Sequence, residues 1–285
     1  SCGSRNLIKK IEIIIIRFRI KVRNNRKMNL EIQHKNALVC GSTQGIGKAS
    51  AIGLAEEGGN VTLVARNEEK LKAVLAELPN NNQCHSYLVA DFSNPQALKE
   101  KLEATEMQFH ILVNNTGGPV GGPIFNAKLE EFESAFTQHL KCNHVLVQAV
   151  VPFMKTQCFG RIINIISTSV KQPLEGLGVS NTIRGAVASW SKTLANELGE
   201  YGITVNNVLP GATGTERLNE IIKNKSAKTG KSFDEVAEAM KKASPAQRFA
   251  KPEEIANAVV FLASEKASFI NGINVPVDGG RTKSL

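Results

Sequence analysis

A glycine-rich turn is the stretch of this sequence best suited to hold a phosphate group. It joins an apolar run to a helical pattern, and its residues are Gly41, Ser42, Thr43, Gln44, Gly45, Ile46 and Gly47. Glycine permits positive φ angles and lets a ligand approach the main chain, and a helix start offers N–H groups and a favourable dipole to an anion. The spacing G-x-x-x-G-x-G differs from the G-x-G-x-x-G fingerprint and could by itself be only a tight turn. The flanking strand and helix favour a dinucleotide site.

The residues after the second apolar run predict which dinucleotide is bound. A site for NAD usually places an acidic residue here, which accepts a hydrogen bond from the ribose 2′-hydroxyl. This chain has Ala65-Arg66-Asn67 instead. Arg66 can pair with a 2′-phosphate, and Ser42 and Asn67 could add hydrogen bonds. The alternative is a solvated arginine at a helix start, where a cation opposes the helix dipole. We therefore predict NADP(H) rather than NAD(H).

Two turns after later strands could extend this cofactor site. Asp91, which precedes Phe92, could accept a hydrogen bond from an adenine amino group, or it could belong to a helix N-cap. The polar turn Asn115-Thr116-Gly117 follows a buried apolar run. It could border the ribose of the cofactor or simply end the strand.

These turns need a framework, and the chain alternates strand and helix patterns from residue 28 onward. Strands are predicted at 36–40, 60–65, 85–90, 109–114, 160–166, 203–208 and 273–276. Helices are predicted at 46–58, 67–78, 94–105, 127–155, 178–200, 214–223, 233–242 and 252–263. Several strands are apolar on both faces, as a sheet covered on both sides requires. The pattern predicts a single-domain, Rossmann-like doubly wound α/β fold of about seven parallel strands, with ligands at their carboxyl ends.

The net charge of +9 would suggest a nucleic-acid partner if it were spread over the domain. Residues 1–27 hold nine basic side chains and one acidic one, so residues 28–285 carry a charge of only about +1. We therefore predict no nucleic-acid partner. The apolar core of residues 1–27 is too short and too charged for a membrane span. We expect residues 1–27 to be a disordered or non-native extension, and residues 28–285 to be the dinucleotide-binding domain.

The five cysteines show no C-x-x-C spacing, and no His/Cys cluster has the spacing of metal ligands. We expect no metal, and reduced thiols in a cytoplasmic protein. Cys40, Cys84 and Cys158 lie on or beside predicted strands, which favours buried apolar positions.

Seven motifs follow one another along the chain: GSTQGIG, ADF, NNTGG, GRIINIIS, YGITVNNVLPG, RFAKPEEIANAVVFLAS and INVPVDGG. Together, over about Leu30 to Arg281, they resemble the short-chain dehydrogenase/reductase family, and the chain is similar to 3-oxoacyl-[acyl-carrier-protein] reductases. NNTGG stands in place of the family's usual N-N-A-G. The resemblance implies a seven-stranded parallel sheet, a small-molecule carbonyl or alcohol substrate, and a homo-oligomer, either dimer or tetramer.

The resemblance also assigns roles to the segment after the sixth strand. It implies that the turn there lies along the nicotinamide, with Pro210, Gly211, Thr213 and Thr215 at the cofactor. An ordinary Pro-Gly turn would explain the bend but not the threonines. Residues 214–246 contain two helices joined near 229–232, and the resemblance implies that they form a mobile lid over the substrate.

The catalytic residues of the family are only partly matched. Ser167 stands at the family's serine, but Ser180 stands at its tyrosine, Arg184 at its lysine and His139 at its asparagine. The chain therefore resembles an atypical subgroup that lacks the Tyr-x-x-x-Lys pair. Ser180 and Arg184 are four residues apart on a predicted helix, so they face the same pocket.

These replacements change which side chain could supply a proton. A serine hydroxyl is much less acidic than a phenol of pKa about 10, and losing a positioned general acid costs roughly 10²–10⁴-fold in rate. Arg184 keeps the positive charge and could still hold the ribose. His139 is a candidate replacement acid, because imidazole titrates near neutrality. It could equally be a packed, hydrogen-bonded side chain.

Two functions of different classes fit these residues. The first is an NADP(H)-dependent oxidoreductase that interconverts a carbonyl and an alcohol, with 3-oxoacyl-type compounds among the candidate substrates. The second is a catalytically degenerate NADP(H)-binding protein that serves as a sensor or partner subunit. The missing tyrosine favours the second, whereas Ser167, Arg184 and the lid segment favour the first.

Overall fold

A computed structural model of the chain describes residues 28–105 and 108–284. Its contacts define a compact unit, Ile32–Leu285, and the account below concerns that unit. The expectations about residues 1–27 lie outside the described residues.

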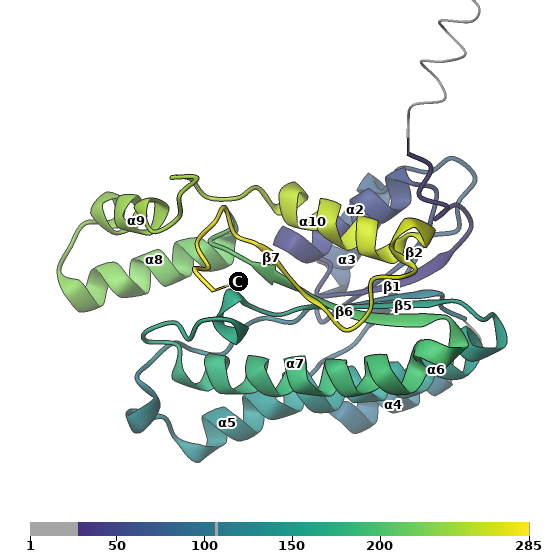
Figure 1. The fold of residues 1–285 in the computed structure, drawn as a ribbon, viewed down its shortest axis with the longest axis horizontal. Helices are drawn as coiled ribbons and strands as arrows, with labels where there is room; N and C mark the ends of the chain where they lie inside the picture. The colour runs from purple at the N-terminus through teal and green to yellow at the C-terminus, as the bar shows by residue number, and fades with distance from the viewer. Residues whose placement is uncertain (1–27, 106–107, 285) are drawn as a thin grey trace, which may run out of the picture. The chain divides into compact units, whose positions relative to one another are not determined.

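Seven parallel strands form one sheet in the order β3-β2-β1-β4-β5-β6-β7, which confirms the predicted Rossmann-like fold (Figure 1). The strands are β1 (Asn36–Cys40), β2 (Asn60–Ala65), β3 (Ser86–Val89), β4 (Ile111–Asn114), β5 (Gly160–Ile165), β6 (Ile203–Pro210) and β7 (Asn274–Val277). The order changes direction between β1 and β4, where β1 pairs with both β2 and β4. Ligands of such sheets bind at the carboxyl ends of the strands beside this point.

Helices cover both faces of the sheet (Figure 1). On one face lie α2 (Gly45–Glu56), α3 (Glu68–Glu77) and α10 (Pro252–Ala263), and α2 packs against α10. The other face carries α4 (Pro95–Glu103), α5 (Leu129–Phe136), α6 (Cys142–Thr156) and α7 (Gly178–Leu198). The largest core cluster joins this second layer to the sheet, with Leu38, Leu112 and Ile162 from strands and Leu146 and Met154 from α6. The apolar strands are therefore covered on both sides, as their sequence predicts.

The helix predicted at 127–155 is not a regular α-helix throughout. It consists of α5, a π-helical segment at Thr137–Lys141, and α6. A π-helical turn accommodates an extra residue within a helix, and such turns are frequent at functional sites. An apolar 3.6-residue pattern on both sides of the turn hides this irregularity, so the sequence predicts one uninterrupted helix.

Two further helices, α8 (Glu216–Thr229) and α9 (Phe233–Lys242), form the arm predicted at 214–246. Thr215 caps α8 by accepting a hydrogen bond from the Leu218 amide, and Gly230 ends the helix at φ +69°. The two helices share a small apolar cluster, made by Leu218, Ile222, Val236 and Ala237. This arm is the expected pair of helices, although its mobility stays a prediction.

The cysteine positions correct part of the sequence-based expectation. Cys40 is buried, as expected, but Cys84 and Cys158 are exposed. Cys158 lies in the turn before β5 at φ +48°, and Cys84 precedes β3, so both lie outside the strands that would bury them. Within the described ranges, no helix is both long and apolar enough to cross a membrane.

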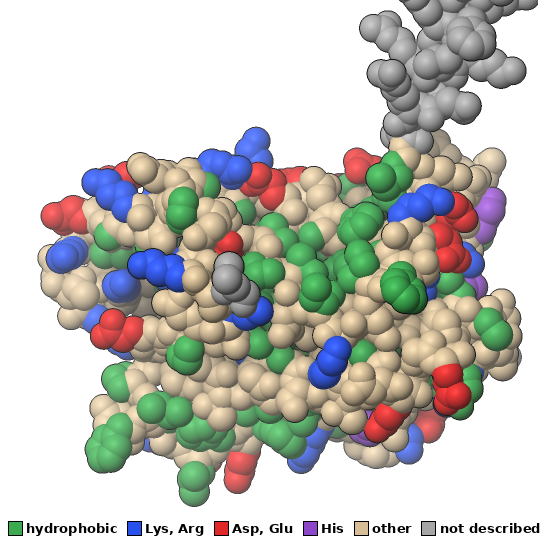
Figure 2. Space-filling view, in the orientation of Figure 1, with side chains coloured by type: hydrophobic (Ala, Val, Ile, Leu, Met, Phe, Trp, Pro, Cys, Tyr) green, Lys and Arg blue, Asp and Glu red, His purple; other side chains and the backbone are tan. Residues whose placement is uncertain are grey.

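Exposed apolar side chains gather in the segment that leads into α5 and at its start: Val120, Ile124, Phe125 and Leu129. Figure 2 shows apolar side chains over the α5 end of the molecule. The expected homo-oligomer remains a prediction, because the structure contains a single chain.

Candidate functional site

The glycine-rich turn connects β1 to α2 with a backbone that only glycine adopts readily. Gly41 and Gly45 have φ angles of +59° and +55°. A Cβ atom at Gly47 would overlap the Gly41 carbonyl oxygen and would lie 2.6 Å from the Asn115 side-chain nitrogen. The first turn of α2 has no side-chain cap and no acidic residue. The start of α2 therefore keeps the electrostatic character of an anion site.

Ser42 does not take the role expected of it. Its side chain is completely buried, and its hydroxyl donates to the Val64 carbonyl oxygen over 3.4 Å. The expected hydrogen bond from this hydroxyl to a 2′-phosphate is wrong, because the hydroxyl fastens the turn to β2. Thr43 and Ile46 are half-buried and Gln44 is exposed, so these are the turn's accessible side chains.

Arg66 and Asn67 follow β2 on the surface. The guanidinium of Arg66 forms no ion pair with any side chain that the structure describes, and the residue is exposed. Asn67 is the N-cap of α3, where its Oδ1 accepts a hydrogen bond of 2.8 Å from the Lys70 amide. Arg66 thus has the unpaired charge that a phosphate partner requires, while the oxygen of Asn67 is already used by the helix.

Asp91 lies in the turn after β3 and is exposed. One of its oxygens accepts a hydrogen bond of 2.9 Å from the Ser93 amide. The alternative role of Asp91 was that of a helix N-cap. Asn94 is the N-cap of α4, where it accepts a hydrogen bond of 3.0 Å from the Ala97 amide. Phe92 is buried and belongs to the core, so its side chain does not face a ligand.

Three consecutive residues, from the last residue of β4 onward, tie separate parts of the sheet's carboxyl edge together. The Asn114 amide donates to the Asn164 side chain on β5 over 2.8 Å. The Asn115 amide lies 3.3 Å from the carbonyl oxygens of both Cys40 and Gly41, at the start of the glycine turn. Thr116 forms a side-chain hydrogen bond with His139 on the π-helical turn. Gly117, the last residue predicted here, has open space where a Cβ would lie.

Arg184 is a buried cation on α7. Only 8% of the residue is exposed, and its Nη1 atom donates to the Ile165 carbonyl oxygen over 2.9 Å. No carboxylate pairs with it among the described residues. Burial lowers the pKa of the guanidinium to about 10, so it stays charged at neutral pH. Buried charges in proteins are normally paired, and this one has donors left for a ligand.

His139 interacts electrostatically with Arg184, but it does not titrate as expected. The residue is 2% exposed. Burial, helped by the charge of Arg184, lowers the pKa of its imidazole to about 2, and a hydrogen bond with the Gly117 backbone opposes this only in part. The expectation of a histidine that titrates near neutrality is therefore wrong. His139 is neutral at physiological pH and holds Thr116 by a hydrogen bond.

The two serines of the predicted catalytic set are half-buried. The Ser167 oxygen accepts a hydrogen bond of 3.1 Å from the Ser169 amide, which leaves its proton free to be donated. Ser180 lies one turn before Arg184 on α7, and no partner is recorded for its hydroxyl among the described residues. Both hydroxyls can therefore bind a polar ligand.

The turn after β6 is held mainly by contacts within the protein. The Gly211 amide donates to the Val277 carbonyl oxygen over 2.9 Å, and a Cβ there would lie 2.7 Å from the Asp278 Cα atom. Thr213 donates to the Gly211 carbonyl oxygen, and Thr215 caps α8. Pro210 ends β6. Thr213 and Thr215, which a Pro-Gly turn alone does not explain, thus have hydrogen-bond partners within the protein. The methyl group of Thr215 also lies close to the glycine turn, 3.1 Å from where a Cβ at Gly45 would be.

Comparison with known proteins identifies the family of the chain. A family model described as enoyl-(acyl carrier protein) reductase matches residues 41–282. A 3-oxoacyl-[acyl-carrier-protein] reductase, FabG of Staphylococcus epidermidis, is 33% identical over 87% of this chain and 98% of its own length. The chain belongs to the short-chain dehydrogenase/reductase family.

Two other members of the short-chain dehydrogenase/reductase family are similar along nearly their whole length. The L-sorbose reductase from Gluconobacter frateurii, whose crystal structure contains NADPH and L-sorbose, is 31% identical, with a TM-score of 0.84 over 90% of this chain and 100% of the other. The NADPH-dependent reductase BacG of Bacillus subtilis is 29% identical over 88% of this chain and 99% of its own length. The predicted cofactor, NADP(H), is the one that these relatives use.

One feature of this short-chain dehydrogenase/reductase is absent from the sequence-based prediction. Four asparagines stand at matching positions on adjacent strands: Asn114, Asn164, Asn207 and Asn274. Their side-chain amides form hydrogen bonds from strand to strand, of 2.8, 3.0 and 2.8 Å. We call this row the asparagine ladder. Its signal in the sequence is an asparagine in each of four apolar runs, but only the strand register shows that they meet.

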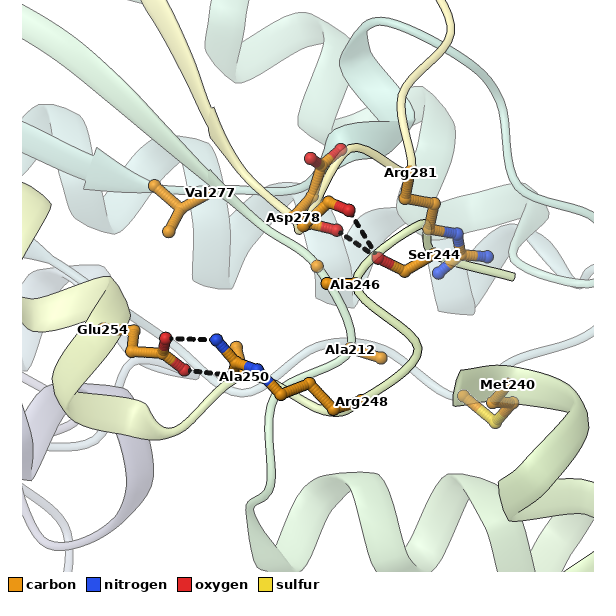
Figure 3. Close-up of a pocket in the computed structure, with 12 residues that line it drawn as sticks. Ala212, Met240, Ser244, Ala246, Arg248, Ala250, Glu254, Val277, Asp278 and Arg281 are labelled. Atoms are coloured by element: carbon orange, nitrogen blue, oxygen red, sulfur yellow. Dashed lines mark hydrogen bonds and ion pairs between the residues drawn. The ribbon is translucent and has the colours of Figure 1, made fainter. Parts of the chain in front are cut away.

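A hollow with a volume of about 130 Å³ lies beside the turn after β6. It is lined by that turn, by α9, by the start of α10 and by the residues after β7 (Figure 3). Arg248 and Glu254 form a bidentate ion pair at its rim, with bonds of 2.6 and 2.7 Å. None of the predicted catalytic residues lines it. Among the described residues, no group of His, Cys, Asp and Glu could hold a metal ion.

Proposed function

We propose that this chain is an NADP(H)-dependent oxidoreductase that interconverts a carbonyl and an alcohol with an altered catalytic set. The observation that carries the proposal is Arg184, a buried cation that has only the Ile165 carbonyl oxygen as a hydrogen-bond partner in the described chain. The L-sorbose reductase, BacG and FabG are reductases by name, and two of them use NADPH by name.

The residues present fit a bound dinucleotide. Gly41 and Gly45 let the turn adopt its positive φ angles, and α2 begins without a side-chain cap or an acidic residue. Arg66 forms no ion pair with the described residues and follows β2, where a 2′-phosphate would need a cation. Arg184 has donors for the ribose hydroxyls on the other side of the crevice. The chemistry that bound NADPH supplies is donation of a hydride to a carbonyl carbon.

The protein's own groups would orient and polarise the carbonyl. Ser167 has a free hydroxyl proton, because its oxygen already accepts from the Ser169 amide. Arg184 stays charged at neutral pH and would stabilise negative charge on the substrate oxygen, an effect that is strong in a buried site. Ser167 and Arg184 would polarise the carbonyl, and Ser180, which lies on the same helix as Arg184, would add a further hydroxyl.

Proton supply is the weak part of this catalytic set. His139 is neutral, with a pKa of about 2, and Ser180 stands where the family has tyrosine. Neither group is an acid suited to neutral pH, so the proton would reach the substrate oxygen from solvent through the serine hydroxyls. We expect slow turnover for this reason. The same observation favours the second candidate, an NADP(H)-binding protein that has lost turnover and acts as a sensor or partner subunit.

Binding and turnover measured on the same preparation separate the two candidates. The full chain would be titrated with NADPH and with NADH, followed by nicotinamide fluorescence. NADPH oxidation would then be followed by absorbance with 3-oxoacyl thioesters, ketoses and simple ketones. Oxidation with any of these supports the oxidoreductase. Tight NADPH binding without oxidation across the panel supports the degenerate binding protein, and failure to bind either nucleotide contradicts both.

A further inference from the structure

Strand β5 holds helix α7 at two adjacent residues. The Asn164 side chain donates to the Ser191 hydroxyl over 2.9 Å, and the next residue, Ile165, accepts a hydrogen bond from Arg184 through its carbonyl oxygen. Ser191 and Arg184 are seven residues apart, so they lie two turns apart on the same face of the helix. The Ser191 hydroxyl in turn donates to the Val187 carbonyl oxygen over 2.7 Å. Ser191 is completely buried, and its hydroxyl both accepts and donates a hydrogen bond.

Asn164 is the branch point of the asparagine ladder. Its Oδ1 atom accepts from Asn114 on β4, and its Nδ2 atom donates both to Asn207 on β6 and to Ser191 on α7. The residue is completely buried. A short amide with partners on two neighbouring strands and one helix is confined to one orientation. This side chain is therefore one of the contacts that hold α7 on the sheet, beside the apolar packing of Val187 against Leu209.

The ladder also reaches the opposite wall of the crevice. Asn114 is followed directly by Asn115, which bonds to the glycine turn, and by Thr116, which bonds to His139. The glycine turn and the helix that carries Arg184 are thus both held relative to Asn164.

We infer that Asn164 is a positioning residue, which acts through Ser191 to place the Arg184 guanidinium at the carboxyl end of β5. The inference rests on the proposed function, because it takes Arg184 to be a cofactor contact. The competing interpretation is that the ladder contributes only to the stability of the sheet.

Ser191→Ala is the variant that separates these interpretations, since it removes the bond to α7 and leaves the three bonds between strands. Asn206→Ala is the matched control. Asn206 is also a buried asparagine on β6, but it bonds to Ile270 and Ile273 and shares no hydrogen bond with the ladder side chains. We expect Ser191→Ala to weaken NADPH binding roughly fivefold or more, the effect of misplacing a charge-assisted hydrogen bond. Asn206→Ala should lower the melting temperature and keep the NADPH affinity within about twofold of wild type.

A measurement without cofactor tests the same inference independently of the proposed function. Hydrogen exchange of the ligand-free protein should be faster in residues 178–190 of Ser191→Ala and unchanged there in Asn206→Ala. Ser191→Thr retains a hydroxyl and should restore both protection and affinity. Wild-type exchange in Ser191→Ala, or equal loss of NADPH affinity in Ser191→Ala and Asn206→Ala, overturns the inference. If the wild type itself does not bind NADPH, the proposed function fails, while the exchange data still decide the role of Asn164.

Discussion

A buried guanidinium with one carbonyl partner destabilises a folded protein and strengthens the binding of a ligand that brings negative charge or hydrogen-bond acceptors to it. Arg184 is such a group, since burial lowers its pKa to about 10 without a carboxylate to compensate. His139, beside it, is neutral for the same reason. At the scale of single residues, Arg184 thus supplies a fixed positive charge, and His139 does not ionise near neutral pH.

Replacing Arg184 should change affinity and stability in opposite directions. Arg184→Met is expected to weaken NADPH binding by about 10- to 100-fold, because a hydrogen bond from a charged group contributes roughly 1.5–3 kcal/mol. The melting temperature of the ligand-free variant should stay the same or rise, since the unpaired charge is gone. Arg184→Lys keeps the charge and should retain most of the affinity. A methionine variant that binds NADPH like wild type would show that Arg184 does not contact the cofactor.

His139 should make stability fall in acid. Its pKa is about 2 in the folded protein against 6.5 for the free side chain. Below pH 6.5 the unfolded chain binds a proton that the folded chain does not, so the free energy of unfolding decreases as pH falls from 6.5 towards 2. The slope is at most about 1.4 kcal/mol per pH unit. In His139→Asn, urea unfolding at pH 7, 6 and 5 should show a flatter dependence, and an unchanged slope would contradict the assigned burial of the imidazole.

At the scale of elements, the glycine turn and α7 respond differently to an added methyl group. In Gly47→Ala the new Cβ would overlap the Gly41 carbonyl oxygen and crowd Asn115. We expect a loss of about 2 kcal/mol or more in the free energy of unfolding, together with weaker NADPH binding. Gly185 lies in α7 with open space at its Cβ position, so Gly185→Ala should stabilise by about 0.5–1 kcal/mol. Thermal unfolding of both variants checks the contrast, and equal destabilisation would refute it.

The sequence was sufficient for elements whose pattern is local. Apolar runs and turn residues placed all seven strands, and the glycine spacing placed the turn between β1 and α2. The sequence was insufficient where the role of a residue depends on which strands pair and in which register. Asn164 interrupts an apolar run in the sequence, and its meaning depends on which residues of β4 and β6 lie opposite. The π-helical turn at Thr137–Lys141 and the burial that fixes the pKa of His139 depend in the same way on tertiary contacts.

At the scale of the whole molecule, the two ends of the sheet have separate tasks. Arg161, at the start of β5, is 2% exposed. It donates to carbonyl oxygens of Gly160, Gly202 and Ser264 and pairs with Glu265 over 3.2 Å. These contacts join the amino end of β5 to the end of α10, while the predicted cofactor residues lie at the carboxyl ends. Stability and binding can therefore be altered separately.

Arg161→Leu should test that separation. Removing the guanidinium takes hydrogen-bond donors away from the carbonyl oxygens of Gly160, Gly202 and Ser264, and we expect a loss of about 2–4 kcal/mol in the free energy of unfolding. Glu265→Gln is the matched control, and it should cost less than about 1 kcal/mol because the carboxylate is partly exposed. Where Arg161→Leu is still folded, its NADPH affinity should equal that of wild type. A large loss of affinity would mean that the two ends of the sheet are coupled.

The widened turn at Thr137–Lys141 also restricts how this chain can change its length. An ordinary α-helix advances about 100° per residue. The wide turn absorbs one extra residue, so deleting one amino acid there would let the segment relax to regular α-helical geometry with α5 and α6 still in register. His139 would then leave Thr116, while the apolar side of α5 would stay against α7. Homologues that lack the π-helical turn should therefore be one residue shorter between 129 and 156, and should lose this histidine–threonine contact.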